Sequence, residues 1–369
     1  MLAQAANNAG LKPLVIDLFA DLDTLAYATD FKQVPALTKE YLAPALDYFI
    51  EHHAVTDVIY GSGFEQHPES LCYLASRCTL LGNSAETFIR LQNKADFFAV
   101  LNRLTIPYPE TAFVAPNNAQ DWLIKPTQGQ GGVGIQRYDA NHKIDTAVYW
   151  QKYQAGSQHS VLFLANGQQL QVIGFNTQWT TRLSDREEFI FSGIINHCDL
   201  AEADKTQIID WLIKLVPAFK LTGLNSLDFI HADGNSMVLE INPRPPASMQ
   251  LYDADLLRRH INMTTSVIGW ADEGSPSFVI DGLRTSTHPM YYTGYQIIYA
   301  EQNIQIPKHY IWENGTMDLP AAGAMCKTGQ PICSIIAHHN QAHAVLNELT
   351  LKQHTIKEGL YTHGTHTQR

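Results

Sequence analysis

Apolar and polar positions alternate along the first part of the chain in runs that predict helices and strands in turn. Residues 13–20 (PLVIDLFA) and 57–61 (DVIYG) are apolar runs typical of buried strands, whereas residues 41–53 and 68–78 have helical spacing. Strands that alternate with helices favour a parallel sheet covered by helices. We therefore predict a first α/β domain over residues 1–85.

The remainder of the chain predicts two further parts. We expect one helix from Thr87 to Leu104, then a small β-rich lid at about 105–155 and a larger α+β half that contains a helix over 203–221. These elements are predicted to form one domain over residues 86–280. Residues 281–369 are predicted to form a small β-rich domain and a solvated tail.

The segment 227–245 (LDFIHADGNSMVLEINPRP) carries two β-type runs separated by turn residues, which predicts a hairpin. If strand pairing is centred near Gly234, Asp228 lies directly opposite Glu240. The two-residue repeat of a strand places Asn242 on the same face. Three oxygen ligands therefore converge at one place.

This arrangement suits a hard divalent cation such as Mg2+, which prefers carboxylate and amide oxygens and relieves the repulsion between facing carboxylates. Arg244, two residues further on, faces the same way and offers a bidentate contact to phosphate. Taken alone, the segment also fits a solvated hairpin with acidic residues on its open face.

A second segment has the composition of a phosphate-binding loop. The apolar run 122–126 (WLIKP) contains Lys125 and is followed by TQGQGGVGI, where glycines let backbone N–H groups approach phosphate while the lysine supplies charge. Its spacing matches neither GxxxxGK[ST] nor a clean GxGxxG, so we expect neither a Walker-type nor a Rossmann dinucleotide site. Alone, it fits a flexible hairpin about as well. The glycines of this segment are Gly129, Gly131, Gly132 and Gly134.

Together with Asn93-Lys94 upstream, these segments resemble the ATP-grasp superfamily, and most closely its biotin-carboxylase-like branch. Lys94 matches the lysine that opens the central domain of that family, and Lys125 matches the lysine that precedes its glycine-rich lid. The resemblance extends over nearly the whole chain, to a group of predicted ATP-dependent carboligases related to biotin carboxylase. Gln151, Lys152 and Tyr153 match the hinge segment that binds adenine in that family. Its metal and phosphate ligands are matched by Asp228, Glu240, Asn242 and Arg244.

The resemblance implies an ATP-grasp fold with a parallel-sheet pre-ATP domain, a two-part α+β grasp and a small C-terminal β-rich domain. It implies ATP and Mg2+ as cofactors. Lys94 and Lys125 would hold the α- and β-phosphates under the closed lid at 129–134, and Arg244 would stabilise the transferring phosphoryl group, which makes Lys125 and Arg244 the expected catalytic residues. Residues Gln151, Lys152 and Tyr153 would face adenine, and Asp228, Glu240 and Asn242 would hold one or two Mg2+ ions.

The chain departs from the family pattern at two places. Residues 1–12 (MLAQAANNAGLK) already read as a helix that ends at Gly10 as its C′ residue, so the first strand of the first domain is expected to be missing. Gln151 stands where many relatives carry glutamate to accept the adenine amino group. A glutamine carbonyl oxygen still accepts that bond, so the change is tolerable.

Composition agrees with an enzyme of this class. The chain has 369 residues, 45% of them hydrophobic, and a formal net charge of -11, which argues against a nucleic-acid surface. No long uncharged apolar run or basic leader is present, so we expect a cytoplasmic protein that does not contact membranes. The five cysteines lack CxxC spacing and are read as free thiols, and a Cys198–His197 dyad is disfavoured because sequence neighbours in an extended segment point apart.

The chemistry implied by the family is activation of a carboxylate by ATP as an acyl phosphate, followed by attack of an amine. We expect small-molecule carboxylate and amine substrates in metabolite or cofactor biosynthesis, with a one-carbon carrier pathway as a refinement. One alternative is a carboxylase that activates bicarbonate through carboxyphosphate. A second is a nucleotide-binding protein without turnover. The oligomeric state is left open, with a homodimer as one option, because apolar faces of the first domain commonly form a twofold contact in relatives.

Overall fold

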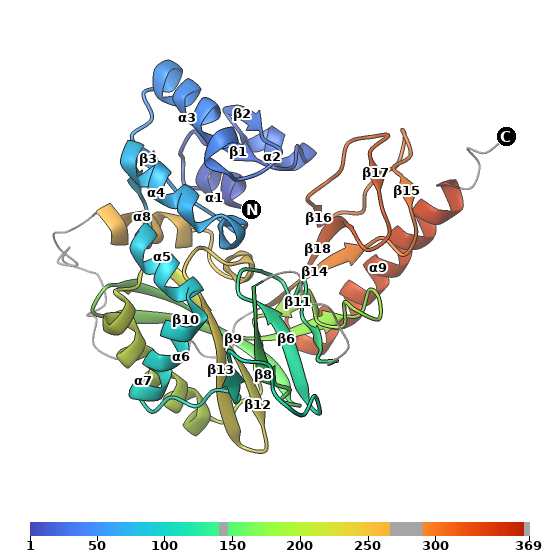
Figure 1. Cartoon of the computed structure of the whole chain (residues 1–369). Coiled ribbons are helices and arrows are strands. Elements are labelled where there is room, and N and C mark those ends of the chain that lie inside the picture. The colour runs from blue at the N-terminus through green and yellow to red at the C-terminus, as the bar shows by residue number, and fades with distance from the viewer. Residues whose placement is uncertain (140–146, 266–290, 365–369) are drawn as a thin grey trace.

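The computed structural model describes residues 1–139, 147–265 and 291–364. In Figure 1 the N-terminal elements, in blue, lie above the green and yellow central elements, and the C-terminal elements, in orange and red, lie to the right. Part of the predicted lid (140–146), the start of the predicted third domain (281–290) and the end of the predicted tail (365–369) lie outside the described residues.

The chain begins with the predicted helix. Helix α1 spans Leu2–Asn8, Ala9 is its C-cap, and Gly10 follows with φ of +76°. The Gly10 N–H donates to Asn7 O and the Leu11 N–H donates to Ala6 O, which is the double hydrogen bond of a Schellman motif. The predicted end of this helix at Gly10 is therefore confirmed.

The first part of the chain alternates strands and helices as predicted, but its strands are shorter than the apolar runs and form two separate parallel pairs. Strand β1 pairs with β2, and β3 pairs with β4. Among the described residues no strand joins the two pairs into one sheet. The elements are β1 (Leu14–Asp17), α2 (Leu22–Tyr27), β2 (Asp30–Gln33), α3 (Lys39–His53), β3 (Asp57–Val58), η1 (Phe64–Gln66), α4 (Pro68–Arg77) and β4 (Thr79–Leu80).

The single helix predicted from Thr87 to Leu104 is wrong, because the chain forms two helices there. Helix α5 covers Ala85–Gln92 and α6 covers Lys94–Arg103. Asn93 between them is extended, and its side chain accepts a hydrogen bond from the Asp96 N–H, as an N-cap does. The break places Lys94 at the first position of α6, where its side chain is buried.

A small antiparallel sheet forms the predicted β-rich lid. Its strand order is β5-β8-β6-β7, and Lys125 on β6 lies opposite Tyr149 on β8. The glycine-rich loop connects β6 to β7. The strands are β5 (Thr111–Ala112), β6 (Trp122–Pro126), β7 (Gln136–Arg137) and β8 (Val148–Lys152).

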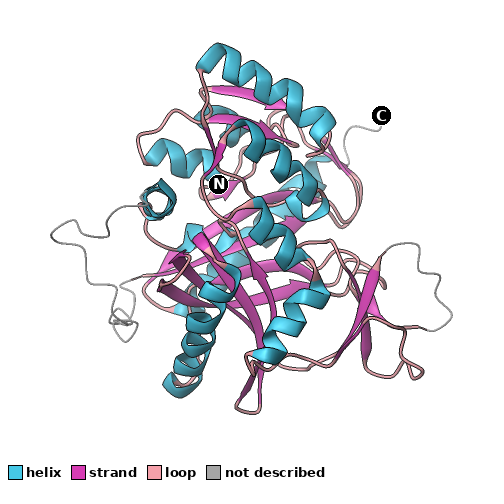
Figure 2. Ribbon diagram, turned by 60° about the vertical axis from the view of Figure 1, so that its left-hand side comes forward, coloured by secondary structure: helices cyan, strands magenta, loops and turns pink. Residues whose placement is uncertain are grey.

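An eight-stranded sheet with the order β13-β12-β9-β10-β11-β14-β18-β16 runs through the molecule. Helices α6 and α7 (Glu202–Phe219) cover one face, where Phe97 and Leu215 share a core with Phe163 and Phe229 of the sheet. Figure 2 shows helices against these strands. The strands are β9 (Ser157–Asn166), β10 (Leu170–Thr181), β11 (Ile190–Ile195), β12 (Thr222–Ala232), β13 (Asn235–Asn242), β14 (Tyr292–Tyr299), β16 (Thr316–Met317) and β18 (Pro331–His339).

The C-terminal part differs from the predicted β-rich domain with a solvated tail. Strands β14, β16 and β18 continue the large sheet, and β15 (Ile304–Gln305) pairs with β17 (Met325–Cys326). The predicted tail is instead the end of the 23-residue helix α9 (Ala342–Gly364), which buries Val345, Leu349 and Ile356 against the sheet. The turn at Asp318 contacts the first domain, since Asp23 accepts from the Asp318 and Leu319 N–H groups.

His260 on helix α8 (Leu256–Thr265) joins the first domain to the large sheet. Its Nδ1 accepts from the Leu224 N–H at 2.8 Å, and its Nε2 lies 2.9 Å from Leu81 O, as a donor. Burial lowers the pKa of this imidazole to about 4. The ring is therefore neutral in the folded protein at neutral pH, with both nitrogens used.

Stability is expected to fall as the pH drops from about 6.5, the usual pKa of histidine in an unfolded chain, to about 4. Below 6.5 the unfolded state takes up a proton that the folded state excludes, so the contribution is complete above 6.5 and is lost at the folded pKa. The loss is on the order of 3 kcal/mol, at about 1.4 kcal/mol per pH unit. Urea unfolding near pH 7 and near pH 4.5 measures it. His260→Gln should show a smaller pH dependence, and an unchanged one would assign the effect to other groups.

Candidate active site

The predicted hairpin is present, and its register brings the two acidic residues together. Strands β12 and β13 pair antiparallel around Asp233-Gly234, with Asp228 opposite Glu240. The register shifts between Asp228 and Phe229, because Phe229 lies opposite Val238 and leaves Leu239 as an extra residue. Without this bulge Glu240 would point to the other face. The bulge therefore aims Glu240 at Asp228.

Asp228 is the centre of the polar cluster on this face. The Asn242 side-chain amide donates to one carboxylate oxygen at 3.0 Å, and the Gln178 amide donates to the other at 3.3 Å. Burial, together with the charge of Glu240, raises the pKa of Asp228 to about 7. Two carboxylates and an amide thus face one another at a partly exposed site, where the Glu240 side chain is 39% accessible. A divalent cation bound by their oxygens would offset the repulsion, so the donor set fits Mg2+.

Two lysines approach the same cluster from different elements. Lys94 Nζ, at the start of α6, lies 3.5 Å from Glu240 Oε2. Burial lowers the pKa of Lys125 to about 8, and the charges of Glu240, Lys94 and Asp228 all act on this ammonium group. The structure therefore brings together both predicted lysines and the predicted metal ligands, although they come from the lid, α6 and the hairpin.

Lys125 is held by the hinge. Its Nζ donates to Gln151 Oε1 at 3.0 Å, while Gln151 Nε2 donates to Thr111 Oγ1 at 3.0 Å. Gln151 itself is buried. Lys152 points the other way and donates to Gln120 O, as the alternation of side chains along a strand requires. Of the three predicted hinge side chains, Gln151 alone contacts a predicted phosphate-binding lysine.

The glycine-rich loop is closed against strand β11. The Phe191 N–H donates to Gly131 O at 2.9 Å, and a Cβ on Gly132 would lie 1.8 Å from Phe189 O. Only a residue without a side chain fits at Gly132, because the two backbones are in direct contact. Gly129, the first glycine of the segment, and Gly134, with φ of +78°, stand at the two ends of this loop.

A pair of charged side chains fastens the lid beside this contact. Arg137 on β7 donates to both oxygens of Glu188, at 2.9 and 2.7 Å. The Arg137 guanidinium also lies 4.5 Å from the ring centre of Tyr153 and 5.7 Å from that of Phe189. Tyr153 is therefore part of the lid contact. The Arg137–Glu188 pair was not predicted, since its members are 51 residues apart.

Arg244 is paired with a residue that the sequence analysis did not identify. Its Nε donates to Glu65 Oε1 at 2.6 Å, and both side chains are largely buried. Glu65 comes from η1 of the first domain, 179 residues away in the chain. Gln178 was missed as well. Neither position lies in a motif whose spacing predicts contact with the hairpin.

Cys198 does not form the disfavoured dyad with His197. His197 pairs with Asp199, and Cys198 Sγ lies 3.3 Å from His159 Nδ1, on β9. Burial raises the pKa of the Cys198 thiol to about 11 and lowers that of His159, so neither charged form is favoured. A thiolate nucleophile is therefore disfavoured here.

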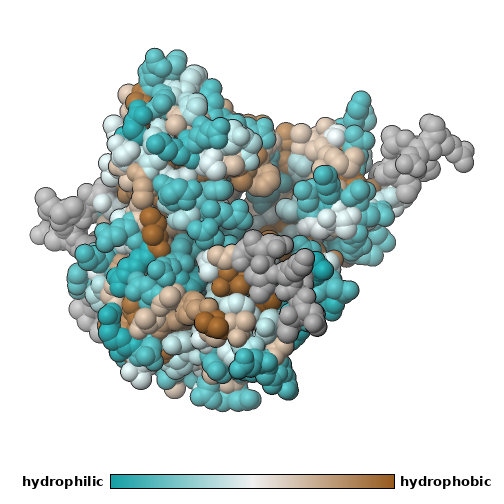
Figure 3. Space-filling view, in the orientation of Figure 1, coloured by the Kyte–Doolittle hydropathy of each residue, from teal (hydrophilic) through white to brown (hydrophobic). Residues whose placement is uncertain are grey.

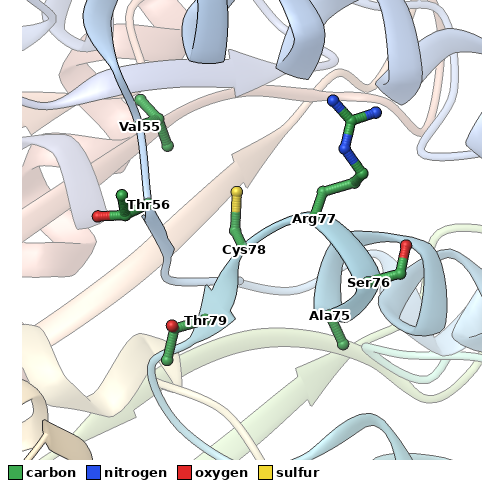
Figure 4. Close-up of a pocket in the computed structure, with 7 residues that line it drawn as sticks. All are labelled: Val55, Thr56, Ala75, Ser76, Arg77, Cys78 and Thr79. Atoms are coloured by element: carbon green, nitrogen blue, oxygen red, sulfur yellow. The ribbon is translucent and has the colours of Figure 1, made fainter.

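Two hollows on the surface lie away from the cluster. One, of about 420 Å³, is lined by Cys78, Arg77 and neighbouring residues of the first domain, as Figure 4 shows. A second, of about 510 Å³, continues from it past Ser84 and Arg90. None of the predicted site residues lines either hollow. Burial raises the pKa of Cys78, so its thiol is not activated.

In the described part of the chain, no helix combines the length and apolar character needed to cross a bilayer. The face seen in Figure 3 is mostly hydrophilic, with hydrophobic residues in small patches.

Lys125→Ala is expected to weaken Mg-ATP binding by roughly 10- to 100-fold, the usual effect of losing a charge-assisted hydrogen bond to a phosphate. The fold should persist, because the side chain contacts the partly exposed site and not a core cluster. Isothermal titration with Mg-ATP measures the change. Lys214→Ala, on an exposed face of α7, serves as the control. Wild-type affinity in Lys125→Ala would count against the assignment of this lysine.

Comparison with known proteins agrees with this geometry. Residues 91–248 match the model of a family described as an ATP-grasp domain. Biotin carboxylase from Campylobacter jejuni aligns over 95% of this chain and 87% of its own, with 15% identity and a TM-score of 0.70. N5-carboxyaminoimidazole ribonucleotide synthetase from Thermus thermophilus aligns over 95% and 93%, with 13% identity and a TM-score of 0.66.

A third match is the biotin carboxylase domain of 2-oxoglutarate carboxylase from Hydrogenobacter thermophilus, solved as a dimer with MgADP, ADP and bicarbonate. It aligns over 95% of this chain and 86% of its own, with 12% identity and a TM-score of 0.72. At such identities the likeness concerns the fold. The predicted ATP-grasp fold, similar to that of biotin carboxylase, is confirmed.

Proposed function

We propose, from the premise that this chain carries an ATP-grasp domain over residues 91–248 in a biotin-carboxylase-like fold, that it is an ATP-dependent ligase. It would activate a small carboxylate as an acyl phosphate, with release of ADP, for attack by an amine. The observation that carries this proposal is the meeting of Lys94, Lys125, Asp228 and Glu240 beside a closed glycine-rich loop.

Mg2+ is proposed to bind at Asp228, Glu240 and Asn242, since these residues supply hard oxygen ligands and a cation would relieve the repulsion between the two facing carboxylates. When bound, the metal neutralises the carboxylates and the phosphate oxygens that approach them. Gln178 holds one oxygen of Asp228 and so fixes the direction of the other. Burial and the charge of Glu240 raise the pKa of Asp228, and a cation bound beside it would act in the opposite direction.

The protein's own groups act mainly by position and charge. Lys94 and Lys125 are placed to bind phosphate oxygens, and the glycine-rich loop covers the site and excludes water, which would otherwise hydrolyse an acyl phosphate. Arg244 is placed to stabilise the transferring phosphoryl group. These roles need little proton transfer from the chain, as is usual in phosphoryl transfer.

The Lys125–Gln151 hydrogen bond suggests how nucleotide enters the hinge. A phosphate oxygen is a stronger partner for an ammonium group than an amide oxygen is, so Lys125 would exchange Gln151 for phosphate. Gln151 Oε1 would then be free to accept the adenine amino group, while its Nε2 remains on Thr111. The exchange of Gln151 for phosphate at Lys125 would thus prepare both the phosphate end and the adenine end of the nucleotide site.

Thermal unfolding with Mg-ATP, with ATP in EDTA and without ligand tests the proposal, since a ligand of the native state raises stability with its concentration. A magnesium-dependent rise supports the site. No rise at nucleotide concentrations of about 1 mM or more would remove the basis for turnover.

The rival reaction is carboxylation through carboxyphosphate, which is supported by the bicarbonate bound to the Hydrogenobacter domain. Both reactions need the same ATP apparatus. ADP release is therefore measured with pairs of acids and amines and with bicarbonate alone. Release that depends on bicarbonate without an amine favours the carboxylase, and release that needs both an acid and an amine favours the ligase. No ADP release with any of these substrates would favour a nucleotide-binding protein without turnover.

A further inference from the structure

One backbone amide connects the lid, the first domain and Arg244. The Gly63 N–H lies 2.9 Å from Gln130 Oε1 in the glycine-rich loop and 2.8 Å from Glu65 Oε2. The other oxygen of Glu65 accepts from Arg244 Nε. The Gly63 N–H is therefore shared between the lid and the carboxylate that holds Arg244.

The position of this amide is fixed by its surroundings. Gly63 has φ of +106°, and a Cβ added to it would lie 2.7 Å from Leu37 Cδ1. The Tyr60 hydroxyl, three residues earlier, donates to Pro243 O beside Arg244. The backbone at Gly63 is therefore held in place and cannot easily move to improve its hydrogen bonds to both Gln130 and Glu65. Because a hydrogen bond shared between two acceptors is weaker to each, the two acceptors compete.

We propose that Gln130 is a positioning residue that couples closure of the glycine-rich loop to the placement of Arg244 through the Gly63 amide. The proposal rests on the proposed function for its consequence, namely that displacement of Arg244 leaves Glu65 free to take the Gly63 amide from Gln130 and so loosens the loop over nucleotide. The coupling itself is a property of the protein without nucleotide, because all of these contacts are present there.

Competition between Glu65 and Gln130 for the Gly63 N–H determines whether a change at the ion pair weakens or strengthens the contact with the loop. While Arg244 neutralises Glu65, the carboxylate binds the Gly63 N–H with moderate strength and leaves part of it to Gln130. Loss of the guanidinium leaves a buried, unpaired carboxylate, which takes the amide fully, since hydrogen bonds to charged groups are the stronger ones. Loss of the carboxylate charge has the opposite effect and leaves the amide to Gln130.

Hydrogen exchange at the Phe191 amide measures the result, because its N–H donates to Gly131 O only while the loop is closed. In nucleotide-free protein, Gln130→Ala and Arg244→Ala should each speed this exchange by about threefold or more. The double variant should be no faster than the faster single one, since both act on one contact. Glu65→Gln should exchange no faster than wild type.

The pair Arg244→Ala and Glu65→Gln separates coupling from a simple structural role, because both break the same ion pair. If both speed exchange equally, or if Gln130→Ala and Arg244→Ala multiply in the double variant, the coupling is refuted. Arg244→Lys keeps the charge and should keep the wild-type rate, which guards against misfolding of Arg244→Ala. Gln128→Ala, two residues before Gln130 and exposed, is the matched control.

The exchange pattern does not depend on turnover. Protein that shows the pattern but gains no stability from Mg-ATP would refute the proposed function and leave the coupling intact. Protein that binds Mg-ATP but lacks the pattern would refute the coupling alone.

Discussion

Glu240→Gln is expected to lower magnesium-dependent ATP turnover by about 100-fold or more, the usual loss when one preorganised electrostatic group is removed from an active site. The substitution removes a charge while keeping the volume, so packing on β13 should be unaffected. It also removes the repulsion between Glu240 and Asp228, which raises the Asp228 pKa in the wild-type protein. The substitution also removes the ion pair between Lys94 and Glu240. Because the lost attraction and the lost repulsion oppose each other, the net change in the free energy of unfolding should be small.

ADP release at increasing Mg2+ concentration measures this effect, with thermal unfolding as the check on the fold. The control is Glu202→Gln on α7, whose carboxylate binds Lys205 in an exposed i,i+3 pair. Normal turnover in Glu240→Gln would show that the facing carboxylates do not hold the metal. A lower melting temperature with normal turnover per folded molecule would point the same way.

The acidic hairpin of β12 and β13 could be predicted from the sequence because its geometry is local. The turn at Asp233-Gly234 and two β-type runs bring Asp228 and Glu240 to neighbouring positions of the two strands, and the bulge at Leu239 places them directly opposite. The pairing is correct for a reason that the sequence did not show, since a two-residue turn without a bulge would place Leu239 opposite Asp228. The extra residue at Leu239 restores the register at the position where the two carboxylates meet.

The partners of this hairpin could not be predicted, because they depend on tertiary contact. Glu65 and Gln178 reach Arg244 and Asp228 from other elements, and a single sequence carries no signal for such distant pairs. The break between α5 and α6 was missed for another reason. The apolar residues on either side of Asn93 keep helical spacing, so a continuous helix was predicted there. The role of Asn93 as an N-cap goes with the buried position of Lys94, which is a tertiary contact.

The C-terminal helix shows how tertiary burial overrides local appearance. The segment 342–364 has scattered histidines and was expected to end as a solvated tail, yet α9 places Val345, Leu349, Ile356 and Leu360 in a core with β18. His354 lies on the exposed side of this helix and pairs with Glu358. The apolar positions at helical spacing were present in the sequence, and the polar residues between them obscured the pattern.

Gly132→Ala and Gly131→Ala form a matched pair that tests the lid as strongly as Glu240→Gln tests the metal site. Both glycines have positive φ, +81° and +61°, so an added Cβ strains each backbone by a similar amount, about 1 kcal/mol. They differ in surroundings. The Cβ at Gly132 would lie 1.8 Å from Phe189 O, whereas nothing lies within 4 Å of the Cβ at Gly131.

Gly132→Ala must therefore push the loop away from β11, which opens the site to water and removes the Phe191–Gly131 hydrogen bond. We expect it to lower ADP release by about 100-fold, with the Phe191 amide exchanging faster, while Gly131→Ala loses less than about tenfold. Both variants should keep the unfolding temperature of the nucleotide-free protein, because the loop adds little to the cores. Equal losses would mean that backbone strain, and not contact between loop and strand, controls closure. Normal turnover in Gly132→Ala would mean that the reaction does not need this closed position at all.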